Sequence, residues 1–335
     1  MKAAVFHGPG DVRFEQVPRP ELEDGEVLLR VRACGICGSD LHVYRHGMFL
    51  GLGLPTATGR ILGHELSGEV AEIRGQVPGV RVGDRVTAPG IGGNAEYVKL
   101  GAQATPLLVP VPDDVSFEEA ATTEPLATSL HAVNLADPAD GETAVILGAG
   151  IIGLGVLQTI KALSSARAIV VDLSDKRLAM AAELGAAATI NAAREEAVPK
   201  IIEMTGSERV SFVAEPLGKV DTVFDCAGVT RDFSGTSALE QAMTLVKQGG
   251  KVILVAVFEK PLELDHNVIV RKGIQLLGSW AWTPAEFVRS MELIQSGKVD
   301  RKPLITHEFP LEKASDAYET QLRTEEAIKV VLKPW

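Results

Sequence analysis

The stretch TAVILGAGIIGLGVLQTI, residues 143–160, constrains the fold of this chain more than any other, because it carries no charged residue over 18 positions. An uncharged run of this length could cross a membrane. However, its glycines gather in the middle, after an apolar run typical of a strand and before a run typical of a helix. This order favours a buried strand, a glycine turn and a helix over a membrane span.

The glycines of this stretch also match the pattern G-x-G-x-x-G, with Gly148, Gly150 and Gly153. In such a turn the first glycine reverses the chain, the second lets the backbone approach a pyrophosphate, and the third lets helix and strand pack closely. The N-terminus of the following helix would then offer free N–H groups to the phosphates. The sequence therefore predicts a dinucleotide-binding site here.

An acidic residue stands where such a site needs one. Asp172 ends the apolar run AIVVD, 19 residues after Gly153. At this spacing a carboxylate accepts hydrogen bonds from a pair of ribose hydroxyl groups, and its charge repels a 2′-phosphate. We therefore predict NAD rather than NADP; the alternative is a solvated carboxylate at the end of a strand.

The rest of the chain shows two different sequence patterns, which indicate two domains. From Thr143 to about residue 275, uniformly apolar strands alternate with amphipathic helices, as in a parallel α/β sheet. Short β-like runs separated by Gly and Pro fill the first 110 residues and return after residue 275. We expect a β-rich domain, residues 1–125 and 276–335, split around a doubly wound parallel sheet, residues 126–275. A helix is predicted to begin at Ser116, with Glu119 completing a capping box.

Composition excludes several classes of protein. The 335 residues include 33 basic and 44 acidic side chains, a net charge of −11 that disfavours nucleic acid and anionic membrane surfaces. Three cysteines are too few for a disulfide framework, which favours a reducing compartment. The first residues also lack the pattern of a secretory leader. We predict a cytoplasmic protein with neither nucleic-acid nor membrane partners.

Two of the three cysteines, Cys34 and Cys37, stand in the motif ACGICGSDLH. Three cysteines cannot build a closed four-cysteine zinc site. A redox pair would begin a helix in a thioredoxin-like unit, whereas this pair follows the strand-like run VLLRVRA. An open catalytic zinc needs only three protein ligands, and further donors stand in RILGHELSGEV, as His64 and Glu65, and in TTEPLATSL, as Glu124.

Together these motifs resemble the zinc-dependent medium-chain alcohol and polyol dehydrogenases over essentially the whole chain. The segments that carry the resemblance occur in the family's order: GICGSDLH, GHELSGEV, VGDRV, AEYV, EPLATSLHAV, GAGIIG, DCAG and AIKVVLKP. The resemblance implies an α/β protein in which a GroES-like catalytic domain is split around a central Rossmann domain. It also implies bound zinc and NAD.

The resemblance assigns the metal ligands residue by residue. Cys37 and His64 match the family's sulfur and imidazole ligands. Glu124 stands where some relatives have a cysteine ligand and the sorbitol-type members have a glutamate. Glu65 is either a direct ligand or a neighbour that binds zinc transiently, and the sequence leaves both roles open. Cys34 has no ligand role in the family and is expected to be a small packed thiol.

The family also implies a path for the proton. Ser39 would lie near the substrate oxygen, the cofactor ribose would come next, and His42 would lie near solvent, where a neutral imidazole accepts a proton. Asp40 would orient the imidazole of His64 without binding the metal itself. The expected cofactor contacts, besides the three glycines and Asp172, are Ile151, Ile152, Arg177 and Arg271, although a surface salt bridge is an alternative role for Arg271.

One departure from the family concerns a second metal. Relatives commonly insert a lobe with four cysteines and a structural zinc between the segments GDRVTAP and GGNAEYV, where this chain has only Gly90 and Ile91. We therefore predict one zinc per chain. The resemblance further implies a homo-oligomer, with a tetramer favoured over a dimer.

The predicted activity is hydride transfer between NAD and a secondary alcohol, namely a diol, polyol or cyclitol, to give the ketone. The motifs GHE and EPL place the chain nearer to sorbitol, threonine and butanediol dehydrogenases than to primary-alcohol enzymes. Two alternatives are a zinc-free, NADPH-dependent quinone or enoyl reductase of the same fold, and a nucleotide-binding protein without catalytic activity. The ligand set disfavours the first, and the pair Ser39 and His42 disfavours the second.

Overall fold

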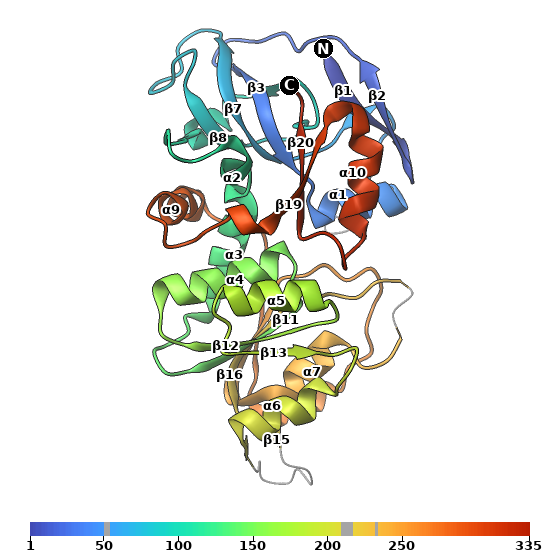
Figure 1. The fold of residues 1–335 in the computed structure, drawn as a ribbon, viewed down its shortest axis with the longest axis vertical. Coiled ribbons are helices and arrows are strands. Elements are labelled where there is room, and N and C mark those ends of the chain that lie inside the picture. Colours follow the sequence, from blue (N-terminus) through green and yellow to red (C-terminus); the bar gives the residue numbers. More distant parts are fainter. Residues whose placement is uncertain (50–53, 209–216, 232–233) are drawn as a thin grey trace. The chain divides into compact units, whose positions relative to one another are not determined.

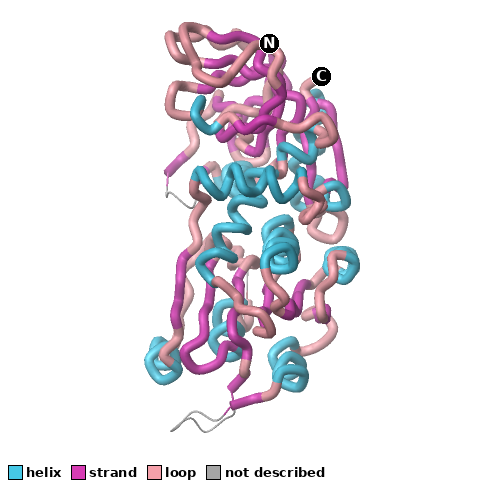
Figure 2. Tube along the Cα trace, turned by 90° about the vertical axis from the view of Figure 1, so that its left-hand side faces the viewer, coloured by secondary structure: helices cyan, strands magenta, loops and turns pink. Residues whose placement is uncertain are grey.

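The computed structural model describes residues 1–49, 54–208, 217–231 and 234–335 (Figure 1). The chain divides into two compact units: unit 1 comprises residues 1–127 and 284–335, and unit 2 comprises residues 128–283. Strands and loops dominate unit 1, whereas unit 2 places its strands between helices (Figure 2).

Unit 2 is built on a six-stranded sheet with the order β13-β12-β11-β16-β17-β18. Every neighbouring pair is parallel, and Val145 lies opposite both Ile169 and Val223. This order is that of dinucleotide-binding sheets, so the predicted doubly wound parallel fold is confirmed. The strands are β11 (Thr143–Leu147), β12 (Arg167–Asp172), β13 (Ala188–Asn191), β16 (Val220–Asp225), β17 (Val246–Leu254) and β18 (Gln275–Gly278), and the short pair β14 (Ser207–Glu208) and β15 (Leu217–Gly218) lies outside the sheet.

Helices cover both faces of this sheet (Figure 1). One face carries α4 (Ile151–Leu163) and α5 (Asp175–Glu183), and the other carries α6 (Ala197–Thr205) and α7 (Ala238–Leu245), with α8 (His266–Lys272) following later in the chain. Val145, Ile169 and Val223 pack with Ile201 and Met243 in one apolar core. Burial on both faces explains why these strands read as apolar runs without alternation.

The uncharged stretch at residues 143–160 folds as predicted, into strand β11, a glycine turn and the start of α4. A side chain at Gly153 would place its Cβ 1.8 Å from the carbonyl oxygen of Gly148, so only glycine lets the helix lie this close to the turn. Within the described ranges, none of the helices has the length and apolar character that a membrane crossing requires.

Unit 1 contains a seven-stranded sheet with the order β10-β8-β7-β3-β20-β19, in which β9 also pairs with β3. Its strands are β3 (Val27–Gly35), β7 (Glu65–Ile73), β8 (Arg85–Pro89), β9 (Tyr97–Leu100), β10 (Val109–Pro110), β19 (Ile305–Pro310) and β20 (Lys329–Lys333). A three-stranded sheet and a hairpin complete the unit with β1 (Lys2–Gly8), β2 (Asp11–Gln16), β6 (Arg60–Ile61), β4 (Met48–Phe49) and β5 (Leu54–Pro55). β3 is therefore the strand on which the unit is organised, because β7, β9 and β20 all pair with it.

The helices of unit 1 are short. They are α1 (Gly38–His46), α2 (Phe117–Ala121), the start of α3 (Thr123–Ala136), α9 (Pro284–Gln295) and α10 (Ala314–Leu322), with single 3-10 turns at Thr105–Leu107, Lys302–Leu304 and Leu311–Lys313. The predicted capping box of Ser116 and Glu119 begins α2, which confirms that helix start.

Three local features of the fold were not predicted from the sequence. Ser39 and Asp40 lie in the first turn of α1, where Asp40 closes a capping box on Cys37, which stands in place of the usual Ser or Thr. A second helix near the C-terminus, α10, follows α9. Strand β17 begins at Val246, and its pairing with β16 contains a register irregularity.

Candidate metal centre and cofactor site

The two predicted sulfur and imidazole ligands lie together in unit 1. Cys37 follows β3 as the N-cap of α1, and His64 immediately precedes β7. Since β3 and β7 are antiparallel, with Gly35 opposite Glu65, these two positions meet at one end of the strand pair. The side chain of Cys37 lies close enough to the imidazole of His64 to raise its pKa.

The carboxylate of Asp40 joins the segments that carry these two residues. Asp40 is buried, and its Oδ2 accepts a hydrogen bond from the backbone N–H of Cys37 at 3.0 Å. Its Oδ1 accepts one from the N–H of Gly63 at 3.4 Å and lies 3.6 Å from Nδ1 of His64. Asp40 therefore occupies a position from which it can orient the imidazole.

Charge and burial act in opposite directions in this cluster. Burial alone would raise the pKa of Asp40, but His64 and the two backbone N–H groups outweigh it, and the pKa lies below its usual range. Burial alone would lower the pKa of His64, but Asp40 and Cys37 outweigh it, and the pKa lies well above its usual range. Asp40 and His64 therefore each stabilise the charged form of the other.

Glu65 is fully buried, and its carboxylate contacts a residue that the sequence analysis did not single out. Both of its oxygens accept hydrogen bonds from Nζ of Lys329, at 2.8 Å and 2.6 Å. Lys329 begins β20, which pairs with β3 on the side opposite β7. The ammonium group of Lys329 therefore binds both oxygens of the Glu65 carboxylate.

The structure does not assemble a complete set of three ligands. Glu124 lies in the first turn of α3. Across the residues that the structure describes, no three His, Cys, Asp or Glu side chains gather closely enough to hold a metal ion. It thus brings Cys37 and His64 together and leaves the choice of a third ligand, Glu65 or Glu124, as a prediction.

The residues predicted to move the proton lie on α1. Ser39 and His42 are three positions apart, so they share one side of the helix. The hydroxyl oxygen of Ser39 is buried and has no hydrogen-bond partner among the described residues. Cys34 is fully buried in β3, which confirms its packed-thiol interpretation, and burial raises its pKa and makes it inert.

In unit 2, Asp172 ends β12 beside the glycine turn. Its Oδ2 accepts a hydrogen bond from the N–H of Ala149 at 2.5 Å, and its Oδ1 accepts from Leu173 and Ser174 at 2.8 Å and 2.9 Å. Gly150 is the N-cap of α4, and no side chain caps this helix end. The predicted ribose-binding carboxylate and the predicted phosphate-binding turn are therefore adjacent.

The other predicted cofactor residues have different surroundings. Ile151 and Ile152 open α4, and a guanidinium nitrogen of Arg177 lies 3.9 Å from the point where a side chain at Gly150 would begin. Arg271 forms an exposed salt bridge with Asp265 at 3.1 Å. This surface salt bridge is the alternative role noted for Arg271, and its contact with a cofactor stays a prediction.

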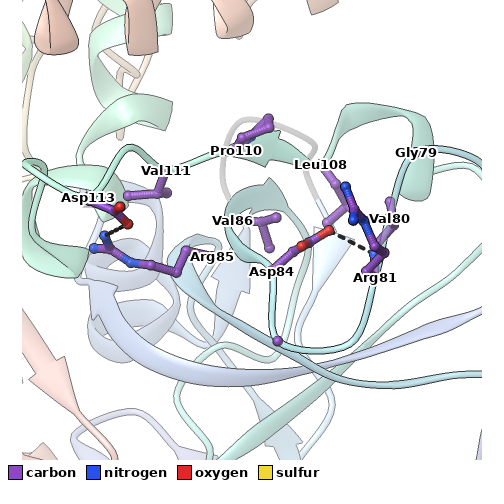
Figure 3. Close-up of a pocket in the computed structure, with 11 residues that line it drawn as sticks. Gly79, Val80, Arg81, Asp84, Arg85, Val86, Leu108, Pro110, Val111 and Asp113 are labelled. Carbon is purple, nitrogen blue, oxygen red and sulfur yellow. Dashed lines mark hydrogen bonds and ion pairs between the residues drawn. The ribbon is translucent and has the colours of Figure 1, made fainter.

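Two surface pockets lie away from all of these residues. One, of about 460 Å³ in unit 1, is lined by residues of the segments 79–86 and 108–113, where Arg85 contacts Asp113 at 3.4 Å (Figure 3). The other, of about 610 Å³ in unit 2, lies between the starts of α6 and α7. Neither pocket is lined by a predicted site residue, so neither changes the assignment of the site.

Comparison with known proteins decides the family. The profile described as "Alcohol dehydrogenase GroES-like domain" matches residues 23–113, and that described as "Zinc-binding dehydrogenase" matches residues 152–296. The sorbitol dehydrogenase of Bacillus subtilis is 32% identical over 100% of this chain and 97% of its own length. The chain belongs to the zinc-binding medium-chain dehydrogenases. The resemblance inferred from the motifs, with its GroES-like and Rossmann domains, is thereby confirmed.

Further relatives of this zinc-binding medium-chain dehydrogenase are similar along their full length. Human sorbitol dehydrogenase is 32% identical over 98% of this chain and 94% of its own length. The crystal structure of 2R,3R-butanediol dehydrogenase from Bacillus subtilis matches with a TM-score of 0.84 and 30% identity, covering 100% of this chain and 99% of that one. Membership implies zinc, a nicotinamide cofactor and a small-molecule alcohol substrate.

Two buried cations near Glu65 were not predicted from the sequence. Lys329 is 1% exposed and Arg301 is 0% exposed. Nε of Arg301 donates to Oγ1 of Thr122 at 3.2 Å, and burial lowers the pKa of Arg301 to about 10. The available signal was the first lysine of AIKVVLKP, a charge within an apolar strand, because a buried charge needs a partner.

Proposed function

We propose that this protein is an NAD-dependent zinc dehydrogenase that converts a secondary alcohol, a diol, polyol or cyclitol, reversibly to the ketone. The observation that carries the proposal is the contact between the Cys37 thiol and the His64 imidazole, with Asp40 bound to both segments. Full-length similarity to sorbitol and butanediol dehydrogenases supports the substrate class.

The chemical types of the proposed donors are those of a catalytic zinc site. Sulfur and imidazole are typical zinc ligands, and a carboxylate commonly completes a three-ligand open site. Glu124 is the third ligand in this proposal, because both oxygens of Glu65 bind Lys329. When bound, zinc supplies a Lewis acid that makes an alcohol easier to deprotonate.

Ser39 and His42 move the proton. The Ser39 hydroxyl, which is buried without a partner among the described residues, accepts the proton released by the substrate hydroxyl group while it donates its own proton onward. His42, one helical turn further along α1, receives the proton and passes it to solvent. A buried polar group without a partner costs free energy, and a substrate hydroxyl would satisfy it.

Asp172 and the glycine turn select the cofactor. The turn 148–153 binds the pyrophosphate at the N-terminus of α4, and Asp172 accepts hydrogen bonds from the ribose hydroxyl groups of NAD. We further propose one zinc per chain, a homo-oligomer with a tetramer favoured over a dimer, and a cytoplasmic location.

The test is the initial rate of NAD reduction across secondary alcohols, diols, polyols, cyclitols and threonine. The rates are measured before chelation, after chelation and after zinc is restored. We expect activity on one of these classes that disappears with the metal and returns with zinc. Activity that survives complete removal of the metal would favour the zinc-free reductase, and NADH binding without turnover of any alcohol would favour the non-catalytic protein.

Cys34 provides a matched control for this test. Cys37→Ala should abolish both zinc binding and turnover, since it removes the proposed sulfur ligand. Cys34→Ala, three positions away and fully buried, should lower stability while leaving zinc bound. Equal loss of zinc in both variants would contradict the assignment of Cys37.

A further inference from the structure

Lys329 is a buried lysine whose ammonium group is fully hydrogen bonded. Its Nζ donates to the carbonyl oxygen of Ile36 at 2.8 Å, and to Oε1 and Oε2 of Glu65 at 2.8 Å and 2.6 Å. The side chains of Lys329 and Glu65 are 1% and 0% exposed. Because an ammonium group has three donors, these three acceptors use its whole capacity.

The acceptors flank the two predicted ligands on which the metal centre depends. Ile36 immediately precedes Cys37, and Glu65 immediately follows His64. The N–H of Ile36 also donates to the carbonyl oxygen of Val330 at 3.0 Å. Strand β20 therefore holds the Cys37 segment through its backbone, and it reaches the His64 segment through the side chain of Lys329.

Asp40 links the same two segments, through the N–H groups of Cys37 and Gly63. The carboxylate of Asp40 thus accepts hydrogen bonds from backbone N–H groups of the two segments. The ammonium group of Lys329 donates hydrogen bonds to a carbonyl in one segment and to the Glu65 carboxylate in the other. We propose that Lys329 is a positioning residue for the metal centre, which sets the separation of Cys37 and His64 by bridging Ile36 and Glu65. This inference rests on the proposed function, because it concerns the zinc site proposed there.

Neutralisation of Glu65 does not account for Lys329 by itself. Arg301, a second fully buried cation, also interacts electrostatically with Glu65. In addition, one of the three donors of Lys329 binds the carbonyl of Ile36, which has no charge to neutralise. Besides neutralising Glu65, Lys329 therefore links the segment that contains Ile36 to the segment that contains Glu65.

Three variants separate the bridge from the charge. Lys329→Met removes both. The double variant Lys329→Met with Glu65→Gln also lacks the bridge but leaves no unpaired carboxylate beside it. Glu65→Gln alone keeps the ammonium on Ile36 and retains an amide oxygen as acceptor. The control is Lys333→Met, in the same strand, where the lysine is partly exposed and pairs with Glu308 at 3.0 Å.

The experiment measures zinc affinity by competition with a chelator and the absorption spectrum of the cobalt-loaded protein, with thermal unfolding as the check on folding. We expect one zinc in the wild type. Lys329→Met and the double variant should bind it about 10- to 100-fold more weakly, with a changed cobalt spectrum, as is typical when a residue supporting metal ligands is lost. Glu65→Gln, which keeps the bridge to Ile36, should lose less zinc affinity than either variant of Lys329, and Lys333→Met should remain within a few-fold of wild type.

A folded double variant that binds zinc as tightly as wild type would overturn the proposal and leave Lys329 only a neutralising role. Lys329→Arg keeps the charge with a different geometry and decides the question if the methionine variants do not fold: weaker binding supports the bridge, and unchanged binding and spectrum overturn it. A wild type that binds no zinc would instead refute the proposed function, so the two failures are distinguishable.

Discussion

The backbone nitrogen of Ala149, within the glycine turn, lies 2.5 Å from Oδ2 of Asp172, at the end of the neighbouring strand. One carboxylate therefore both fixes the turn and stands where a ribose would bind. Under the proposed function, a change of this charge should alter the choice of cofactor, which is the first prediction.

Asp172→Ser should narrow the preference for NAD over NADP by about tenfold or more, because it removes both a charge-assisted acceptor and the repulsion of a 2′-phosphate. The measurement is the ratio of kcat/KM for the two cofactors. Asp175→Ser, on the adjacent helix α5, is the control and should leave the ratio unchanged. An unchanged ratio in the Asp172 variant would remove Asp172 from the cofactor site.

His42→Ala should slow alcohol oxidation by about tenfold or more at low pH and less at high pH. At high pH, hydroxide can take the proton directly, so the imidazole matters least there. Added imidazole buffer should restore part of the rate. His7→Ala, whose histidine pairs with Glu15 at 2.6 Å, should behave as wild type. A pH profile that coincides with wild type would exclude His42 from the relay.

Gly63→Ala should lower the free energy of unfolding by at least about 2 kcal/mol and reduce zinc content. Gly63 has a φ of +89°, and a Cβ there would lie 2.4 Å from Oδ1 of Asn94 and 2.7 Å from the sulfur of Cys34. Gly59 has a similar φ of +83° but open space around it, so Gly59→Ala should cost only about 1 kcal/mol and leave zinc bound. Equal effects on zinc in both variants would show that the space around residue 63 does not matter.

Lys272 should make the free energy of unfolding of unit 2 rise with pH in the alkaline range. Its Nζ donates to the carbonyl oxygens of Met243 and Thr244, and burial lowers its pKa to about 8 from 10.5. The folded state therefore binds fewer protons than the unfolded state between these values, so stability rises with pH there. The unfolding free energy of wild type minus that of Lys272→Met should increase by about 1 to 3 kcal/mol between pH 7.5 and 10.5.

Lys247 provides a control of opposite sign for this measurement. The hydrogen bond that Lys247 donates to the carboxylate of Asp221 raises the pKa of Lys247, so its contribution to stability is lost as the pH rises through the folded-state pKa. The difference between wild type and Lys247→Met should therefore stay constant up to about pH 10.5 and shrink only above it. A flat difference for Lys272→Met would mean that its ammonium group is not destabilised by burial.

Much of the fold follows from local pattern in the sequence. Apolar runs bounded by glycine predicted β11 and β16, since strands buried on both faces need no polar alternation. The helix α1 was missed because Cys37 replaces the usual capping residue, so the signal for a helix start was absent.

The candidate site was predictable only in part, for a physical reason. Cys37 and His64 stand in glycine-rich motifs whose chemistry is visible in the sequence. Lys329 acts through a hydrogen bond to a residue 264 positions away, and no local pattern reports such a long-range pair. Only the pairing of β20 with β3, on the side opposite β7, brings the two together.

The most direct test of the central claim is the rate of NAD reduction, on the best alcohol substrate, measured against the number of zinc ions bound per chain. Metal-free protein is loaded stepwise, and bound zinc is quantified at each step. We predict a rate that rises in proportion to bound zinc and reaches its maximum at one zinc per chain. A rate that is independent of zinc, or a requirement for two tightly held zinc ions, would contradict the account.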